Sequence, residues 1–260
     1  MGVLEAIKKK KERILIIGHT GHGKTYTATR VAYELAKAGK KVLYIDTEMG
    51  AIDEFSTLEI TEDIDKNIVY VKVDNFIDLK KYAINYTNKV HTVIIDPIRL
   101  TSLSRTTAKE LFIKKGVRYV GESIIPIEDP DTFHLRGFDY QLPNEWTNEL
   151  LLKIGSGVCN YVVTELIPVK LSSEIKIPKK GGNVSIEHLF MQEGNIPKKL
   201  AEYYDLFGYF DRVVLMERRN NEYFGIILKW RGKNIQGKRV DNVYEIIVKK
   251  LLGDSKWYTR

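Results

Sequence analysis

The sequence predicts an α/β protein with a mainly parallel sheet flanked by helices and a C-terminal extension of antiparallel strands. Up to residue 96, apolar runs of strand length alternate with helical segments, which is the pattern of βαβ units. From residue 212 onward, strand-like runs are separated by tight turns instead. Because 43% of the 260 residues are apolar, the chain can bury its own core, and we expect a single domain over residues 1–260.

The first predicted strand, residues 14–17, leads into a loop that reads GHTGHGKT over residues 18–25. A G-x-x-x-x-G-K-T loop turns its backbone N–H groups toward phosphate oxygens; its lysine reaches the β- and γ-phosphates, and its threonine hydroxyl suits Mg²⁺. Because the backbone makes the cradle, we expect the two histidine side chains to face solvent. The residues expected to contact the nucleotide are Gly18, His19, Thr20, Gly21, His22, Gly23, Lys24, Thr25 and Tyr26.

A chance glycine-rich turn is the alternative to a phosphate-binding loop. The apolar run before the loop and the stripe Ala28, Val31, Ala32 and Leu35 after it place the loop between a strand and a helix, as the motif requires. The positive N-terminus of that helix would also face the anion. The segment therefore predicts that the chain binds a nucleoside triphosphate.

The remaining elements follow from shorter patterns. We expect strands at residues 41–46, 67–74, 91–96 and 161–164, and helices at 76–88 and 144–154. Antiparallel strands are expected at 212–217, 223–230 and 243–249, with turns at 219–221 and near Gly237. Weak patterning predicts loop or insertion regions at 97–141 and 167–199, and residues 1–12 form a basic N-terminal segment.

Two carboxylates end predicted strands at the same sheet edge as the glycine-rich loop. Asp96 ends an apolar run, where it can hold Mg²⁺ through the waters of the ion, opposite Thr25. Glu48 follows the strand at 41–46 and is our candidate to orient and partly deprotonate an attacking water. Each has a plain alternative: an apolar run that ends in Asp is common by chance, and Glu48 can be a surface acid on a loop.

Together these motifs resemble the core of the RecA/RadA/KaiC-like ATPases, over residues 13–250. The resemblance implies a RecA-like P-loop NTPase fold that uses ATP and Mg²⁺, with Lys24 and Glu48 as catalytic residues. It also implies that Thr164, in the pair Thr164-Glu165 that ends the strand following the Asp96 strand, senses the γ-phosphate. One departure is Pro97, where the family often has Ser or Thr.

Lys229-Trp230-Arg231 resembles the Lys-x-Arg pair that reaches the neighbouring subunit's nucleotide in several members. The resemblance therefore implies a homo-oligomer, a hexamer or a filament, with nucleotide at the subunit interfaces. A cation there would stabilise charge on the transferring phosphoryl group. The alternative for Lys229 and Arg231 is a solvated strand face.

The spelling of the loop is also similar to that of translational GTPases, which read Gly-His-x-Asp-His-Gly-Lys-Thr. Those proteins need an Asn-Lys-x-Asp motif to read guanine. The nearest match here is Asn88-Lys89-Val90-His91, which ends in His and precedes a strand. We therefore expect ATP and not GTP.

The formal net charge of +7 fits a polyanionic partner. In the resembling ATPases, loops at the places of 97–141 and 167–199 bind DNA, and Lys170, Lys176, Lys179 and Lys180 flank two glycines in the second region. We expect single-stranded DNA bound by charge and shape, in recombination, repair or replication. Two alternatives remain: a solvated lysine-rich loop, and a regulator or motor subunit whose partner is a protein.

The sequence has no apolar stretch of membrane-spanning length, and its first residues lack the apolar core of a signal peptide. We therefore expect a cytoplasmic protein without a membrane partner.

Overall fold

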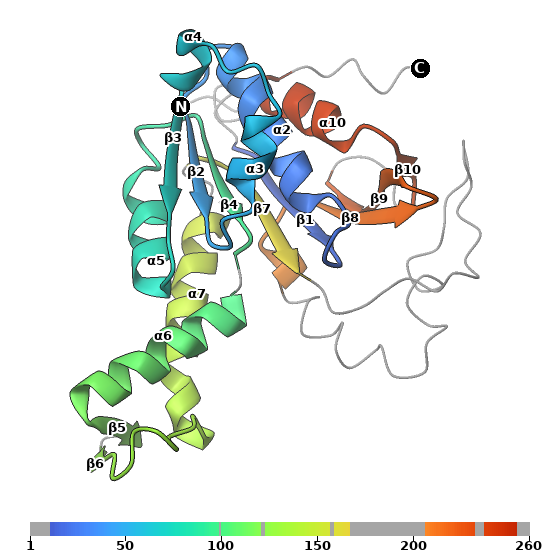
Figure 1. Cartoon of the computed structure of the whole chain (residues 1–260). Coiled ribbons are helices and arrows are strands. Elements are labelled where there is room, and N and C mark those ends of the chain that lie inside the picture. Colours follow the sequence, from blue (N-terminus) through green and yellow to red (C-terminus); the bar gives the residue numbers. More distant parts are fainter. Residues whose placement is uncertain are drawn as a thin grey trace, which may run out of the picture.

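Residues 11–98, 100–120, 123–156, 159–166, 206–231 and 237–253 are described by the computed structural model. Their strands form one eight-stranded sheet, in the order β10-β9-β8-β1-β7-β4-β2-β3, and one separate hairpin, β5-β6 (Figure 1). The strands of the large sheet are β1 (Arg13–Gly18), β2 (Val42–Asp46), β3 (Ile68–Lys72), β4 (Thr92–Asp96), β7 (Asn160–Leu166), β8 (Arg212–Arg219), β9 (Glu222–Trp230) and β10 (Arg239–Val240). The helices are α2 (Lys24–Lys37), α3 (Ala51–Ser56), α4 (Glu62–Asp65), α5 (Phe76–Asn85), α6 (Leu100–Lys115), α7 (Gln141–Gly155) and α10 (Val243–Leu251). Between α6 and α7 lie β5 (Val117–Val120), β6 (Ser123–Pro126) and the short 3-10 helix η1 (Gly137–Tyr140).

Six neighbouring strands of the large sheet, β3, β2, β4, β7, β1 and β8, run parallel. Strands β9 and β10 add antiparallel pairs on the β8 side. The predicted fold class is therefore confirmed. Parallel pairing brings the carboxyl ends of β1, β2 and β4 to one edge of the sheet, where Asp46 and Asp96 are register partners. In open parallel sheets, ligands generally bind at this edge.

Helices cover both faces of the sheet, so its central strands are apolar throughout. Along β1, Ile14 and Ile16 pack into one core cluster with residues of α2 and α10. Leu15 and Ile17 belong to the other cluster, which includes residues of α5 and α7. The continuous apolar run of β1 thus results from burial on two sides.

The segment expected as a last antiparallel strand is instead the helix α10, so that prediction was wrong. Val243, Ile246, Ile247 and Leu251 are buried, with spacings of three, one and four residues that fit a helical face and not the two-residue period of a strand. Its β-branched residues suggested a strand, but α10 packs against α2 (Figure 1). The turn expected at 219–221 is confirmed, with Asn220 and Asn221 at positive φ.

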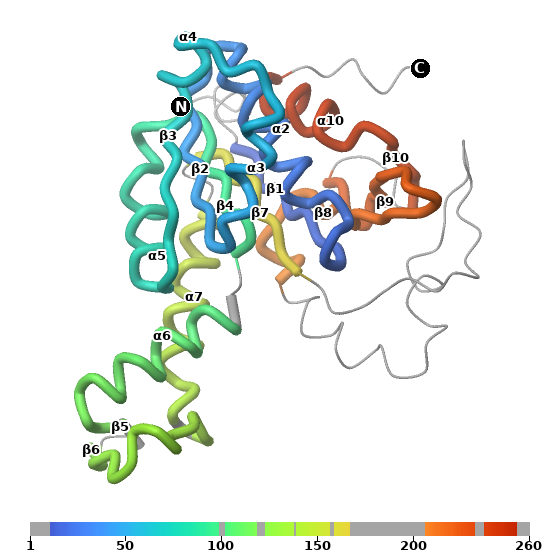
Figure 2. The backbone as a smooth tube through the Cα atoms, viewed as in Figure 1, coloured from blue at the N-terminus to red at the C-terminus, as the bar shows by residue number. Residues whose placement is uncertain are grey.

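The region 97–141 was expected to be irregular, and most of it is ordered secondary structure. Helix α6 runs outward from the sheet and carries the β5-β6 hairpin at its far end, while α7 returns toward the sheet (Figure 2). The buried face of α6 includes Ser104 and Thr107, and the Thr107 hydroxyl accepts a hydrogen bond from the Phe76 backbone N–H at 2.9 Å. Hydroxyl residues on the buried face weaken the apolar periodicity that reveals a helix in sequence.

The second expected loop region, 167–199, lies outside the described residues, and so do its four lysines. Residues 1–10 of the basic N-terminal segment lie outside them too. None of the helices in the described ranges has the length and apolar content that crossing a membrane requires.

Candidate functional site

The glycine-rich loop connects the end of β1 to the start of α2. Gly21 and Gly23 have φ of 76° and 80°, a left-handed conformation that glycine adopts without a Cβ penalty. Gly23 is the N-cap of α2 and supplies no side chain to the first N–H groups of the helix. These donors are left to an external acceptor, which is the arrangement that binds phosphate at a helix N-terminus.

Lys24 lies across the mouth of this loop. Its Nζ donates a hydrogen bond to the carbonyl oxygen of His19 at 3.0 Å. Burial lowers the pKa of the Lys24 ammonium, and the carboxylates of Asp96, Glu48 and Glu165 counteract that shift. A bound triphosphate would supply further negative charge and favour the protonated lysine.

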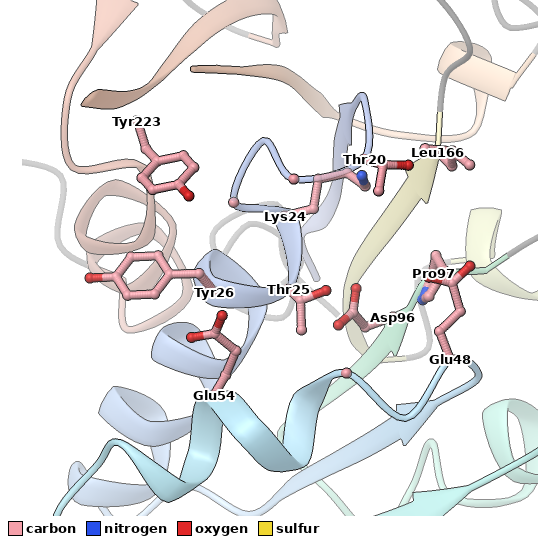
Figure 3. A pocket seen from close by; sticks show the side chains of 13 residues that line it. Thr20, Lys24, Thr25, Tyr26, Glu48, Glu54, Asp96, Pro97, Leu166 and Tyr223 are labelled. Carbon is pink, nitrogen blue, oxygen red and sulfur yellow. The ribbon is translucent and has the colours of Figure 1, made fainter. Parts of the chain in front are cut away.

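Asp96 lies at the end of β4 and is only 1% exposed. Its carboxylate accepts hydrogen bonds from the hydroxyls of Tyr44 at 2.7 Å and Thr164 at 2.5 Å, and the Thr25 side chain lies beside it in the same pocket (Figure 3). Burial raises the pKa of Asp96, and the neighbouring hydroxyls of Thr164, Tyr44 and Thr25 partly offset the shift. The site thus presents a fixed, buried carboxylate beside the Thr25 hydroxyl.

Thr164 was expected to sense the γ-phosphate directly. Its side chain is fully buried, points to Asp96, and does not line the pocket described below. The residue lies on the face of β7 that meets Asp96. In this structure its contact with a nucleotide would therefore run through that carboxylate.

Glu48 lies on the loop between β2 and α3, and Asp46 shapes this loop. The Oδ1 atom of Asp46 accepts the backbone N–H groups of Glu48 at 2.9 Å and Met49 at 2.7 Å, and its Oδ2 accepts that of Ala51 at 3.1 Å. The Tyr70 hydroxyl donates to the same Oδ2 at 2.9 Å. Asp46 thus organises the loop, and the Glu48 side chain remains exposed.

These groups surround one pocket of about 360 Å³. Figure 3 shows Lys24 on one side, Thr25 and Asp96 at the centre, and Glu48 beyond Asp96. The sequence-predicted residues that line it are Thr20, Gly21, Gly23, Lys24, Thr25, Tyr26, Glu48 and Asp96. Gly18 and the two histidines of the loop are not among its lining residues.

The His22 side chain was expected to face solvent, but it is only 15% exposed. It packs toward β8, with Nδ1 3.3 Å from the Met216 carbonyl oxygen and 3.7 Å from a Glu217 carboxylate oxygen. His19 is more open and contacts the backbone of Thr20. Neither histidine lines the pocket.

Lys229 and Arg231 lie at the opposite edge of the sheet from the glycine-rich loop. Because β9 is antiparallel to β8, the end of β9 lies beside Arg212 at the start of β8. Lys229 donates to the Phe207 carbonyl oxygen at 2.6 Å, and Arg231 pairs with Asp211 at 3.1 Å. Neither residue can complete the pocket of its own chain.

Five lining residues were not identified from sequence: Gly50, Glu54, Pro97, Leu166 and Tyr223. Tyr223 is the most informative of them. Its ring would lie 2.9 Å from a Cβ at Gly23, so the β8-β9 hairpin packs directly on the phosphate loop. No sequence pattern links these two positions, which are brought together only by the pairing of β8 with β1.

A buried strand, a left-handed glycine loop and an uncapped helix N-terminus opposite a buried aspartate are the defining parts of P-loop nucleotide-binding proteins, and this chain has them in that order. A family model described as an AAA domain matches residues 12–125, which include the loop, Glu48 and Asp96.

Among solved structures, the chain is similar to a KaiC-like protein from the hyperthermophilic archaeon Pyrococcus horikoshii. The two are 16% identical, the match covers 88% of this chain and 84% of the other, and the TM-score is 0.47. Comparison with curated proteins gave no match.

Proposed function

We propose that the protein is a Mg²⁺-dependent ATPase in which the loop and Lys24 hold the triphosphate and Glu48 orients the attacking water. One observation carries the proposal: Lys24, Thr25, Asp96 and Glu48 come from three segments of the chain and line one pocket. The sequence lacks the guanine-reading motif of the similarly spelled GTPases, which supports ATP as the substrate.

Thr25 and Asp96 are the residues that would hold Mg²⁺. Both offer oxygen, the ligand type that Mg²⁺ prefers, and both side chains line the same pocket as neighbours (Figure 3). Mg²⁺ is commonly bound through one or two protein groups together with waters and substrate phosphates, so a site of this size fits. When bound, the ion would neutralise charge on the β- and γ-phosphate oxygens.

Hydrolysis requires a water in line with the bond between the γ-phosphorus and the β–γ bridging oxygen. As the water oxygen bonds to phosphorus, that bond breaks, ADP leaves, and the water proton passes to the Glu48 carboxylate. Glu48 is exposed at the pocket, while Asp96 is buried and accepts hydrogen bonds from the hydroxyls of Tyr44 and Thr164. This difference in surroundings supports Glu48 as the base and Asp96 as the metal-holding group.

The test is ATP hydrolysis and ATP binding by the wild type and by Lys24→Ala, measured with and without Mg²⁺. We expect the substitution to abolish binding or turnover, because the lysine contacts the β- and γ-phosphates. Lys37→Ala, at the other end of α2, is the matched control. Equal turnover by wild type and Lys24→Ala would refute the proposal.

We also propose that the ATPase acts on single-stranded DNA as a homo-oligomer, with Lys229 and Arg231 serving a neighbouring pocket. The net charge of +7 supports a polyanionic partner, and Lys114 and Lys115 are exposed at the end of α6. The Arg231 side chain is 56% exposed, which supports its use by another subunit.

A protein partner is the second candidate, and the β5-β6 hairpin favours it. Ile124 is 64% exposed there, at the end of the projecting α6–α7 region. The two candidates separate in an ATPase assay with and without single-stranded DNA at low and moderate salt. Stimulation by DNA that weakens with salt would support DNA as the partner. If DNA neither stimulates turnover nor binds in a salt-sensitive way, the DNA proposal is refuted.

A further inference from the structure

A second cavity of about 360 Å³ adjoins the phosphate pocket. The two cavities share Tyr26 and Tyr223, and the second continues along Asn242 and Tyr244 at the start of α10. Figure 3 shows the Tyr26 and Tyr223 rings on the side of the phosphate pocket away from Asp96 and Glu48. A ligand held by the loop could therefore extend past Tyr26 into the second cavity.

Three tyrosine rings line part of this cavity, together with Thr27, Met216, Asp241 and Val243. The rings of Tyr26 and Tyr223 are nearly parallel, at 19°, with centroids 6.5 Å apart, and Tyr244 meets Tyr26 edge-on at 6.5 Å. A flat group stacked between two rings needs ~3.5 Å on each side, or ~7 Å between the ring planes. Since Tyr223 is 41% exposed and lies on a hairpin, a small rotation of its ring would admit a flat group between the two faces.

Asn242 supplies a polar edge to the cavity. It occupies the N-cap of α10 but makes no capping hydrogen bond, and its Nδ2 donates to a Glu245 carboxylate oxygen at 3.1 Å. Because a carboxylate only accepts, this contact fixes the orientation of the amide. The amide has a second hydrogen and an oxygen, a donor and acceptor pair that matches N7 and the N6 amino group of adenine.

We infer that this cavity is the base-binding subsite of the nucleotide, in which Tyr26 and Tyr223 stack on adenine and Asn242 reads its N6–N7 edge. The inference deepens the proposed ATPase function and rests on it. The order along the chain supports it, because Tyr26 directly follows Thr25 at the phosphate end. Guanine presents two acceptors, O6 and N7, on the same edge, so the Asn242 oxygen would oppose O6.

The experiment compares the binding of ATP, GTP and inorganic tripolyphosphate, each with Mg²⁺, by calorimetry. We expect wild type to bind ATP more tightly than the other two. Tyr223→Ala should weaken ATP binding on the order of 10- to 100-fold. Asn242→Ala should reduce the preference for ATP over GTP by about tenfold. In Asn242→Ala the affinity for tripolyphosphate should stay within about twofold of wild type, because Asn242 does not line the phosphate pocket. Asn85→Ala, an exposed asparagine at the end of α5, is the matched control.

Wild-type affinity for tripolyphosphate equal to that for ATP would overturn the inference. An Asn242→Ala variant with an unchanged preference for ATP over GTP would overturn it as well, even if Tyr223→Ala disturbs the loop through its contact with Gly23. Both results leave the ATPase proposal standing if Lys24→Ala still loses binding. A wild-type protein that binds neither ATP nor tripolyphosphate would refute the proposed function itself, and the subsite with it.

Discussion

Asp46 fixes the position of Glu48 through a hydrogen bond from the Glu48 backbone N–H to Asp46 Oδ1 at 2.9 Å. Asp46 is 1% exposed and also accepts the N–H groups of Met49 and Ala51. Met49 holds a positive φ of 65° within this turn, a conformation that is uncommon for a residue other than glycine. A buried acid with no proposed contact to the nucleotide therefore decides where the candidate catalytic acid lies.

Replacing Asp46 with Ala should lower both stability and turnover. The change leaves three backbone donors without their acceptor, so the free energy of unfolding should fall by ~2–3 kcal/mol. The catalytic rate should fall more than ATP affinity, because the triphosphate is held elsewhere. Denaturant unfolding and ATPase assays measure both effects, with the exposed Asp74→Ala as control. A turnover rate equal to that of the control would contradict the role of Asp46.

Glu48→Gln should retain ATP binding and lose hydrolysis. Glutamine keeps the size of the side chain but cannot accept the water proton, and a general base contributes on the order of 10²- to 10⁴-fold in rate. Steady-state turnover and ATP titration separate the two effects. Glu59→Gln, an exposed glutamate after α3, should behave like wild type. Wild-type turnover by Glu48→Gln would remove Glu48 from this role.

Asp96→Asn should stabilise the protein at neutral pH while impairing Mg²⁺-dependent turnover. Burial raises the pKa of Asp96 in the folded protein, so ionisation of this group opposes folding. The contribution of protonated Asp96 to the free energy of unfolding is complete below 3.8, the pKa of an unperturbed aspartate. This contribution is lost as the pH rises through the pKa of Asp96 in the folded protein. The variant should therefore be more stable than wild type at neutral pH, because asparagine carries no charge to bury.

This gain should shrink as the pH approaches 3.8 from above. Chemical unfolding of both proteins across this pH range is the measurement. A stability difference that grows as pH falls would show that the shift has the opposite sign.

Gly23→Ala should destabilise the protein more than Gly39→Ala. Both glycines have positive φ, 80° and 71°, so both substitutions introduce left-handed strain of ~1–2 kcal/mol. Only Gly23 would also bring a Cβ within 2.9 Å of the Tyr223 ring, whereas nothing lies within 4 Å at Gly39. Thermal unfolding of the two variants tests this difference in stability. If the difference is as large when both variants also carry Tyr223→Ala, the predicted clash is not its cause.

Mixing Arg231→Ala with Lys24→Ala subunits should restore activity that neither variant has alone. If arginine acts on a neighbouring pocket, about a quarter of the wild-type rate is expected in an equal mixture. Half of the pockets are intact, and half of their neighbours supply the arginine, as in a head-to-tail interface. ATPase rates at several mixing ratios measure this recovery. No recovery at any ratio would contradict action between subunits.

Local patterns along the chain predicted the alternation of strands and helices up to residue 96, the phosphate loop, and the two carboxylates near it. They failed where local preference and tertiary packing disagree. The Val- and Ile-rich segment of α10 is a helix because its apolar face packs on α2. Helix α6 was missed because its buried face includes Ser104 and Thr107, whose hydroxyls weaken the apolar periodicity of a helix. Thr164 was given a direct role at the phosphate, but its hydroxyl faces Asp96.

The sequence alone determined the phosphate-binding loop, because strand, loop and helix are consecutive and each has a local signature. It also determined that Asp96 and Glu48 reach the same edge, because parallel strands end together. Only the tertiary structure decided the role of Asp46, the packing of Tyr223 on Gly23 and the distance of Arg231 from its own pocket. These depend on side-chain direction and on strand pairing between distant segments, which no local pattern records.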